Sequence, residues 1–297
     1  MTELVASGTT RAPSLGKLKD LAALGKPRLS LLVIFTTAVG VWLAPTPLGP
    51  ITTMIFLFAT SALVASANTM NCWVEKEIDG LMKRTCDRPL PAGRLKPRTA
   101  LIFGIILVVV SLTLIGWTTN ALTTILGAIA FLTYVLIYTP LKRVTPWAVL
   151  VGAVPGALPP LMGWTAATNE LALPGLFLFG VLFLWQLPHF LAISLYLEDD
   201  FRRGGIRVLP VARGRGVAWA HLLLYVACLF VFSLAAWPLH LAGPLYATVA
   251  AVMGLCWLLL AAAGLRGRAS DGWARGNFGF SLLYLPLLIT VLVLDAA

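Results

Sequence analysis

The chain has 297 residues, of which 59% are hydrophobic and only 11% are charged, whereas soluble domains carry about 25% charged residues. With a mean hydropathy of +0.89, this composition excludes an ordinary soluble domain and predicts an integral membrane protein. No charged segment, short apolar stretch and cleavage site open the chain, so we expect no signal peptide. The four cysteines form no CxxC pair, so we expect neither a disulfide framework nor a zinc site.

Nine apolar runs follow one another along the chain, and at roughly 20 residues per span each can cross a bilayer. They lie at about 29–45, 51–73, 99–117, 121–139, 147–164, 172–197, 217–237, 241–264 and 277–295. The pattern predicts an all-α, polytopic membrane protein with about nine transmembrane helices around a central apolar cavity. We expect residues 1–25 to form a mobile cytoplasmic tail and residues 26–297 to form a single transmembrane domain.

All 22 lysines and arginines lie in the N-terminal tail or in the loops after the second, fourth, sixth and eighth predicted spans. Because positive loops stay on the cytoplasmic side, this alternation predicts a multi-pass protein of the cell (inner) membrane. Its N-terminus and charged loops would be cytoplasmic and its C-terminus outside. The formal net charge of +10 is then explained by topology and by attraction to the lipid bilayer, and no nucleic-acid partner is expected.

The end of the second predicted span carries three oxygen-bearing side chains, Asn71, Glu75 and Asp79, spaced four residues apart. On a helix this spacing stacks them on one face, about 6 Å from one to the next. Carboxylates stacked at a membrane surface repel one another unless a cation lies between them. Mg²⁺ prefers a few carboxylates together with substrate phosphate oxygens, and the basic residues that follow can hold the rest of a diphosphate. The alternative is a solvated helix end whose charges only stop the span.

A second acidic cluster, Glu198-Asp199-Asp200, ends the sixth predicted span and is followed closely by two arginines. Successive residues splay by about 100° on a helix, so not all three acids can face one ion. Asp199 and Asp200 can each share a face with Tyr196. Two acidic clusters on the same membrane side can share one or two Mg²⁺ ions around a diphosphate if their helices pack together. The alternative is a charged helix cap in which the acids pair with the arginines.

Several longer strings of the sequence have no use in a generic span. They are K-P-R at 26–28, N-x-x-x-E-x-E-x-D at 71–79, M-K-R-T-x-x-R-P-L at 82–90, G-R at 93–94, Y-T-P-L-K-R-x-T-P at 138–146, G-A-L-P-P-x-x-G-W at 156–164, W-Q-x-P-H-F at 185–190 and D-F-x-x-G-G-I-x-x-L-P-V at 200–211. Over roughly residues 25–290 the chain resembles the UbiA superfamily of intramembrane prenyltransferases. Within that superfamily it is most similar to the protohaem IX farnesyltransferase (haem O synthase) family.

This resemblance implies transfer of a farnesyl group from farnesyl diphosphate to the vinyl group of protohaem IX (haem b). Water is added, and haem O and diphosphate are formed for the biogenesis of haem-copper terminal oxidases. The resemblance further implies Mg²⁺ as a cofactor and a haem A synthase or oxidase-assembly partner. The implied Mg²⁺ ligands are Asn71, Glu75, Asp79, Asp199 and Asp200. The implied diphosphate-binding residues are Arg28, Lys83, Arg84, Arg88, Lys142, Arg143 and Tyr138, and Tyr196 would orient the ligands.

One histidine and a few exchanged residues refine this picture. His189 follows Pro188 inside a predicted span, where a polar side chain needs a partner. It could ligate haem iron or hydrogen-bond a propionate, or it could be a satisfied interhelical histidine. Glu75 and Glu77 stand where the family usually has aspartate, and Phe201 replaces a usual tyrosine. These differences leave the metal chemistry intact.

Two other functions fit parts of the sequence. A related UbiA-type prenyltransferase acting on an aromatic acid or a quinone precursor would use the same metal site, but the W-Q-x-P-H-F and Y-T-x-x-K-R-x-T strings favour haem. A membrane transporter also carries intramembrane acids near broken helices, but usually near the bilayer midplane, whereas these acids lie at the ends of spans. We therefore expect a Mg²⁺-dependent intramembrane prenyltransferase.

Overall fold

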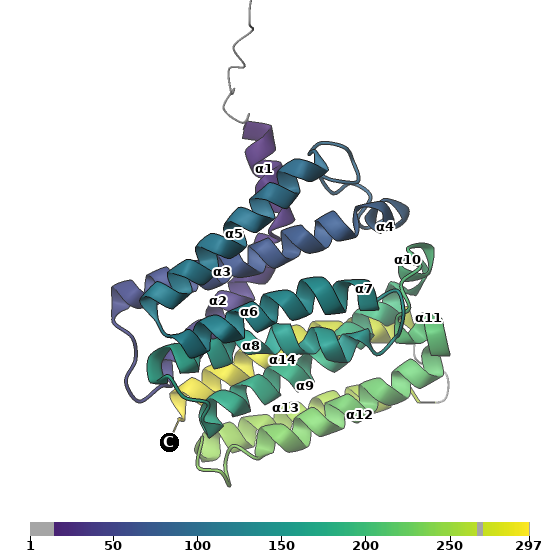
Figure 1. The fold of residues 1–297 in the computed structure, drawn as a ribbon. Coiled ribbons are helices and arrows are strands. Elements are labelled where there is room, and N and C mark those ends of the chain that lie inside the picture. The colour runs from purple at the N-terminus through teal and green to yellow at the C-terminus, as the bar shows by residue number, and fades with distance from the viewer. Residues whose placement is uncertain (1–14, 266–269, 297) are drawn as a thin grey trace, which may run out of the picture.

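The computed structural model describes residues 15–265 and 270–296, except for the side chains of residues 15, 28 and 29. This part of the chain is helical and contains no strand (Figure 1). The helices are α1 (Leu15–Leu24), α2 (Pro27–Trp42), α3 (Pro50–Val74), α4 (Lys76–Leu81), α5 (Pro97–Thr118), α6 (Ala121–Leu132), the π-helix η1 (Thr133–Tyr138), α7 (Thr139–Leu141), α8 (Ala148–Thr168), α9 (Leu173–Tyr196), α10 (Glu198–Arg203), α11 (Leu209–Arg213), α12 (Arg215–Leu234), α13 (Pro244–Ala262) and α14 (Asp271–Leu294).

The prediction of a multi-pass, all-helical membrane protein is confirmed, but the count of nine spans is not. Within the described residues, eight helices are long and apolar enough to cross a membrane; α6, η1 and α7 together form one of them. The first predicted span, α2, has only 16 residues, about 24 Å of helix against a hydrocarbon core of roughly 30 Å. The apolar run continues past Trp42, but Pro45 and Pro47 follow closely and cannot extend a helix.

The helices form two packed groups that meet at α8 and α9. One group of buried side chains comes mainly from α9, α12, α13 and α14, and the other comes mainly from α3, α5, α6 and α8. Figure 1 shows α3 and α5 on one side of the bundle, α12 and α13 on the other, and α8, α9 and α14 between them. The short helices α4, α7, α10 and α11 lie together at one end of the bundle, and this end carries both acidic clusters.

Helices α2 and α8 touch backbone to backbone. A Cβ atom added to Gly40 would lie 2.0 Å from Pro160 O, and one added to Gly163 would lie 2.1 Å from Thr37 O. Small residues at such crossings let membrane helices approach closely without the packing of large side chains. This contact holds α2 against α8, the most buried of the eight spans.

The helix that leads to Lys142 widens into a π-helix at Thr133–Tyr138. Pro140 follows at once and cannot donate a backbone hydrogen bond to the preceding turn. Thr139 Oγ1 instead donates a 2.8 Å hydrogen bond to Tyr134 O. Turns of this kind occur mostly as local features inside α-helices and often at functional sites, and this one carries Tyr138 to the end of the bundle where the acids lie.

Part of the segment 1–25, which we expect to be a mobile cytoplasmic tail, is helical. Residues 15–24 form helix α1, and Leu24 is 1% exposed in a cluster with Cys72, Leu90 and Ala100. Burial of this leucine holds α1 against the bundle. The lysines of the segment made it look too polar in the sequence for such a contact to be expected. Residues 1–14 lie outside the described residues.

We expect Gly163→Ala to destabilise the protein by about 1–3 kcal/mol, the usual cost of overpacking, because the added Cβ would press against the backbone of α2. Gly279→Ala is the matched control, since Gly279 also lies in a spanning helix but has no atom within 4 Å of an added Cβ. The measurement is the thermal unfolding midpoint of both purified variants in detergent. Equal midpoints would contradict the close contact of α2 and α8.

Candidate active site

The first acidic cluster lies on two helices and not on the single helix that we predicted. Helix α3 ends at Val74 and α4 begins at Lys76, with Glu75 at the joint (φ −95°, ψ 9°). Hydrogen bonds from Glu75 N to Asn71 O (2.9 Å) and from Asp79 N to Glu75 O (2.8 Å) bridge the joint. The three predicted residues therefore stay in helical register although the axis is interrupted.

Asn71 and Glu75 form a buried polar cluster with the end of α7. Asn71 is 2% exposed and Glu75 is 5% exposed. Asn71 Nδ2 donates to Glu75 Oε2 (2.8 Å) and lies 3.2 Å from Thr139 Oγ1. The Lys142 ammonium lies 2.7 Å from Glu75 Oε1 and 4.9 Å from the centre of the Tyr138 ring. The structure thus brings four predicted site residues together from segments far apart in the sequence.

Asp79 is fully buried and paired on one side only. Arg88 Nη1 lies 2.7 Å from Asp79 Oδ2, while Asp79 Oδ1 has no hydrogen-bond partner among the described residues. Thr85 Oγ1 donates to the backbone oxygen of Asp79 and holds the following turn (2.8 Å). Buried carboxylate oxygens are normally satisfied, so the free Oδ1 fits a cation. Together with the oxygens of Asn71 and Glu75 it offers the ligand chemistry that Mg²⁺ prefers.

Two acids of the second cluster, Glu198 and Asp200, have different partners. Asp200 is 7% exposed and accepts hydrogen bonds from the backbone N–H groups of Lys83 (2.7 Å) and Arg84 (3.3 Å). Glu198 pairs with Arg202 at 2.6 Å and with Arg215 at 3.2 Å. Asp200 therefore ties α10 to the basic loop that follows α4.

The structure does not gather the acids of both clusters into one cage. Within residues 15–265 and 270–296, no three His, Cys, Asp or Glu side chains are grouped closely enough to hold a metal ion. Asp199 is exposed, and Asp200 is occupied by backbone amides. Of the two clusters, the first combines a free carboxylate oxygen with other oxygen atoms that can bind a metal. The second cluster holds the neighbouring loop in place through Asp200.

A cavity of about 520 Å³ lies between the basic loop and the start of α10. Its lining mixes cations, acids and one phenol: Lys83, Arg84, Leu195, Tyr196, Leu197, Glu198, Asp199, Asp200, Arg203, Arg215 and Asp271. The volume falls in the range of about 300–1,000 Å³ that is typical of ligand sites. Anionic groups of a ligand can enter here from the same end of the bundle that carries the first cluster.

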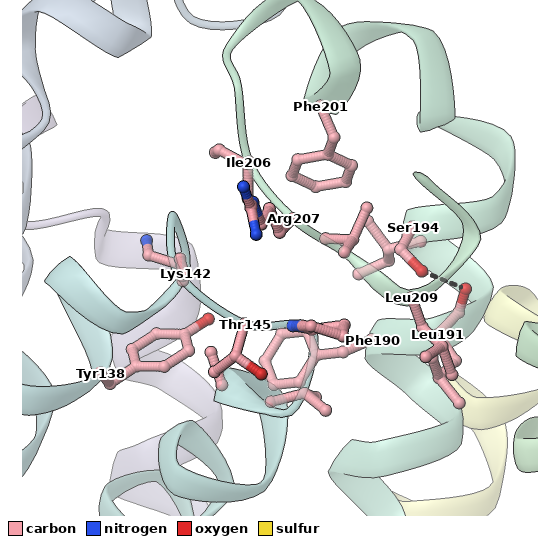
Figure 2. A pocket seen from close by; sticks show the side chains of 15 residues that line it. Tyr138, Lys142, Thr145, Phe190, Leu191, Ser194, Phe201, Ile206, Arg207 and Leu209 are labelled. Atoms are coloured by element: carbon pink, nitrogen blue, oxygen red, sulfur yellow. Dashed lines mark hydrogen bonds between the residues drawn. The ribbon is translucent and has the colours of Figure 1, made fainter. Parts of the chain in front are cut away.

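A second, smaller recess of about 90 Å³ adjoins Tyr138 and Lys142. Figure 2 shows these two side chains on one side of it, Leu191 and Ser194 of α9 on the other, and Phe201 closing it. The lining is mainly apolar. Because it is far smaller than ordinary ligand pockets, we interpret it as packing space beside the lysine and not as a substrate site.

Lys26 is a site residue that the sequence analysis did not name. It has a left-handed backbone (φ 52°) at the N-terminus of α2, and its Nζ lies 3.5 Å from Asn71 Oδ1. Burial lowers the pKa of Lys26 to about 8, because an ammonium group loses hydration on leaving water. The only signal for it in the sequence was its place in the K-P-R string. Thr139, whose Oγ1 lies 3.2 Å from Asn71 Nδ2, was also missed.

The structure does not place three of the predicted site residues beside the first acidic cluster. Arg143 is exposed and makes no side-chain hydrogen bond or ion pair within the described part of the chain. The side chain of Arg28 lies outside the described residues. His189 lies within α9 and hydrogen-bonds Ser281 of α14 through Nδ1 (2.7 Å).

Known proteins resemble this chain over nearly its whole length. It is 50% identical over 296 residues to a protein named protoheme IX farnesyltransferase from Anaeromyxobacter sp. (strain Fw109-5), with 100% of both chains covered. The protein of that name from Myxococcus xanthus (strain DK1622) is 47% identical over 286 residues, covering 96% of this chain and 97% of that one.

Solved structures share the fold at low identity. A digeranylgeranylglyceryl phosphate synthase superposes with a TM-score of 0.79 at 18% identity, covering 95% of this chain and 99% of that one. A UbiA homolog from Archaeoglobus fulgidus bound to DMAPP and Mg²⁺ superposes with a TM-score of 0.69 at 15% identity, covering 92% and 99%. The model of the UbiA prenyltransferase family matches residues 33–283, and the chain belongs to that family.

Proposed function

We propose that this protein transfers the farnesyl group of farnesyl diphosphate to a vinyl group of protohaem IX, with addition of water, to give haem O and diphosphate. The observation that carries this proposal is the 50% identity, over the full length of both chains, to a protein named for that reaction. The buried carboxylates and cations at one end of a helical bundle support a diphosphate-releasing chemistry there.

The first acidic cluster is suited to bind the diphosphate together with a divalent cation. Asn71, Glu75 and Asp79 would hold Mg²⁺, as the free oxygen of Asp79 and the Mg²⁺-bound relative support. When bound, the ion would neutralise the negative charge of the leaving diphosphate. Lys142 and Arg88, which contact these acids, would turn to the diphosphate oxygens, since both make strong charge-assisted hydrogen bonds with phosphate.

The reaction then follows from charge stabilisation and exclusion of water. The allylic C–O bond breaks, and its electron pair leaves with the diphosphate, which the cations hold. The terminal vinyl carbon of haem attacks C1 of the farnesyl cation and forms the new C–C bond. Water adds to the resulting cation beside the porphyrin and loses a proton, which gives the hydroxyl group of the product. The apolar bundle keeps other water away from the first cation.

The second cluster would act partly by positioning. Asp200 binds the amides of residues 83 and 84 and so fixes where the Lys83 and Arg84 side chains begin. Both side chains line the larger cavity beside Tyr196 and would bind the outer diphosphate oxygens. Asp199, which lines the same cavity, would bind Mg²⁺ through water. Arg28 and Arg143 remain proposed diphosphate contacts.

The placement in the membrane is part of this proposal. The N-terminus and the active-site end would face the cytoplasm and the C-terminus the outside of the inner membrane, as the alternation of positive loops predicts. A haem A synthase or oxidase-assembly protein would receive the product.

The direct test incubates the purified protein in lipid with haem b, farnesyl diphosphate and Mg²⁺ and identifies the haem product by mass. We expect haem O and released diphosphate, and loss of both when a chelator removes the metal. Prenylation of an aromatic acid in place of haem would contradict the proposal, and so would the absence of diphosphate release.

We expect Asp79→Asn to lower single-turnover product formation by at least about 10²-fold, roughly 3 kcal/mol, the loss of one strong electrostatic contact. Glu77→Gln is the matched control, because Glu77 lies on the same short helix but is exposed and should retain activity. Full activity of Asp79→Asn at saturating Mg²⁺ would exclude a ligand role for Asp79.

A second prediction concerns the two clusters together. If Asp79 and Asp200 serve one diphosphate site, then Asp79→Asn, Asp200→Asn and the double variant should have similar residual activity, because residues that act as a unit are strongly non-additive. The measurement is single-turnover product formation for all three proteins. Losses that multiply would show two independent contributions, and a silent Asp200→Asn would leave Asp200 with a structural role only.

Lys26 would add a positive charge beside the diphosphate, because its Nζ lies 3.5 Å from Asn71 Oδ1. Its lowered pKa then predicts that activity falls at alkaline pH. The ammonium is present below pH about 8 and is lost as the pH rises through that value, so diphosphate binding and product formation should fall there. Arginine stays charged at these pH values, so Lys26→Arg should move the alkaline limb of the pH–activity curve to higher pH. Lys96→Arg, at an exposed position, is the control and should leave the limb in place. An unshifted limb in Lys26→Arg would assign it to another group.

A further inference from the structure

Two helices of the bundle, α9 and α14, carry a ladder of side chains that begins at Tyr196 beside the larger cavity and continues into the span, away from the proposed diphosphate contacts. Tyr196 and His189 lie seven residues apart on α9, two helical turns or about 10.5 Å along the axis, and so share a face. Phe278 of α14 contacts both rings, at 5.0 Å from His189 and 5.8 Å from Tyr196. Arg275 lies over the Tyr196 ring at 5.6 Å, and Ser281 hydrogen-bonds His189.

The hydrogen bonds at the inner end of this ladder determine which nitrogen of His189 is free. Ser281 Oγ lies 2.5 Å from Phe278 O, which can only accept, and 2.7 Å from His189 Nδ1. With the serine proton directed to Phe278 O, the serine oxygen accepts from Nδ1–H. This geometry favours the tautomer in which Nε2 carries the lone pair. No group within the described residues hydrogen-bonds Nε2.

The ring of His189 is also fixed in orientation. Trp185 stacks on it at a centroid distance of 4.6 Å and donates through Nε1 to Ser281 O (2.8 Å). A histidine whose Nδ1–H is held by an oxygen, with Nε2 free, is the usual arrangement of a metal-ligating histidine.

The outer end of the ladder carries an arginine. Arg275 is exposed near the start of α14. Its neighbour Tyr196 also lines the 520 Å³ cavity, whose lining combines cations such as Lys83 and Arg84 with the acids Glu198, Asp199, Asp200 and Asp271. A haem is a flat apolar ligand with an iron at its centre and two carboxylates on one edge. Each part of haem has a counterpart in the ladder. The iron matches the His189 nitrogen within the span, the flat ring matches the aromatic side chains, and a carboxylate matches Arg275 at the end.

Resting on the proposed function, we infer that this ladder binds the haem substrate. His189 Nε2 is the axial ligand of the iron, and Arg275 binds a propionate at the end of the bundle, with the cavity cations available to the other. Ser281 is a positioning residue that sets the tautomer of His189. The ladder thereby places the porphyrin edge beside the diphosphate site, with its carboxylates turned toward water.

The test is a spectroscopic titration of the purified protein in detergent with ferric haem b and with its dimethyl ester, whose propionates are uncharged. Wild type should give a histidine-ligated Soret band with both. His189→Ala should lose that band and regain it with added imidazole, and Ser281→Ala should weaken binding by roughly 10-fold or more. Arg275→Gln should weaken haem b by roughly 10-fold but not the ester, while Arg275→Lys should restore binding.

Arg98→Gln is the control, since Arg98 is exposed at the start of α5 and should bind both ligands like wild type. Haem O formation is measured on the same preparations, so that the two proposals can fail separately. If wild type makes no haem O, the proposed function fails. If it makes haem O while His189→Ala keeps the wild-type spectrum, or while Arg275→Gln binds haem b and the ester like wild type, the ladder is not the haem site.

Discussion

Charge compensation inside a helical bundle is the constraint on which the rest of the site depends. Glu75 and Asp79 are almost fully buried, and a buried carboxylate without a partner costs several kcal/mol. Lys142 and Arg88 meet this requirement from two other segments. These pairs therefore draw the end of α7 and the loop after α4 onto the α3–α4 joint. Such pairs add little net stability compared with apolar side chains of the same size, so their value lies in the charged surface that they assemble.

The transmembrane scaffold supports this assembly through the close packing of its centre. Helix α8 has three internal prolines, and its contacts with α2 and α9 rely on missing side chains. Gly163 and Gly40 admit the backbones of α2 and α8, and Gly156 leaves room for the Gln186 side chain, which an added Cβ would meet at 2.0 Å. Gln186 of α9 donates to Ala153 O and Leu182 O. Helices α8 and α9 thus form a tightly packed interface between the two groups of helices.

Local features of the site could be predicted from the sequence, while tertiary partners could not. The four-residue spacing of Asn71, Glu75 and Asp79 correctly placed them in helical register, because hydrogen bonds persist across the joint. The break itself, the free oxygen of Asp79 and the nearness of Lys26 depend on packing and have no local signal. Asp200 was predicted as a metal ligand, but its hydrogen-bond partners are backbone amides, which every sequence has. The short α2 shows that hydropathy overestimates a span where prolines stop the helix.

Because Asp200 binds two backbone amides, the path of the basic loop does not depend on which side chains the loop carries at those positions. Main-chain N–H groups are the same whatever side chains follow, so one carboxylate can fix the path of residues 83 and 84 without engaging either cation. A substitution of either side chain would therefore change the charge that lines the cavity while the path of the loop stays the same.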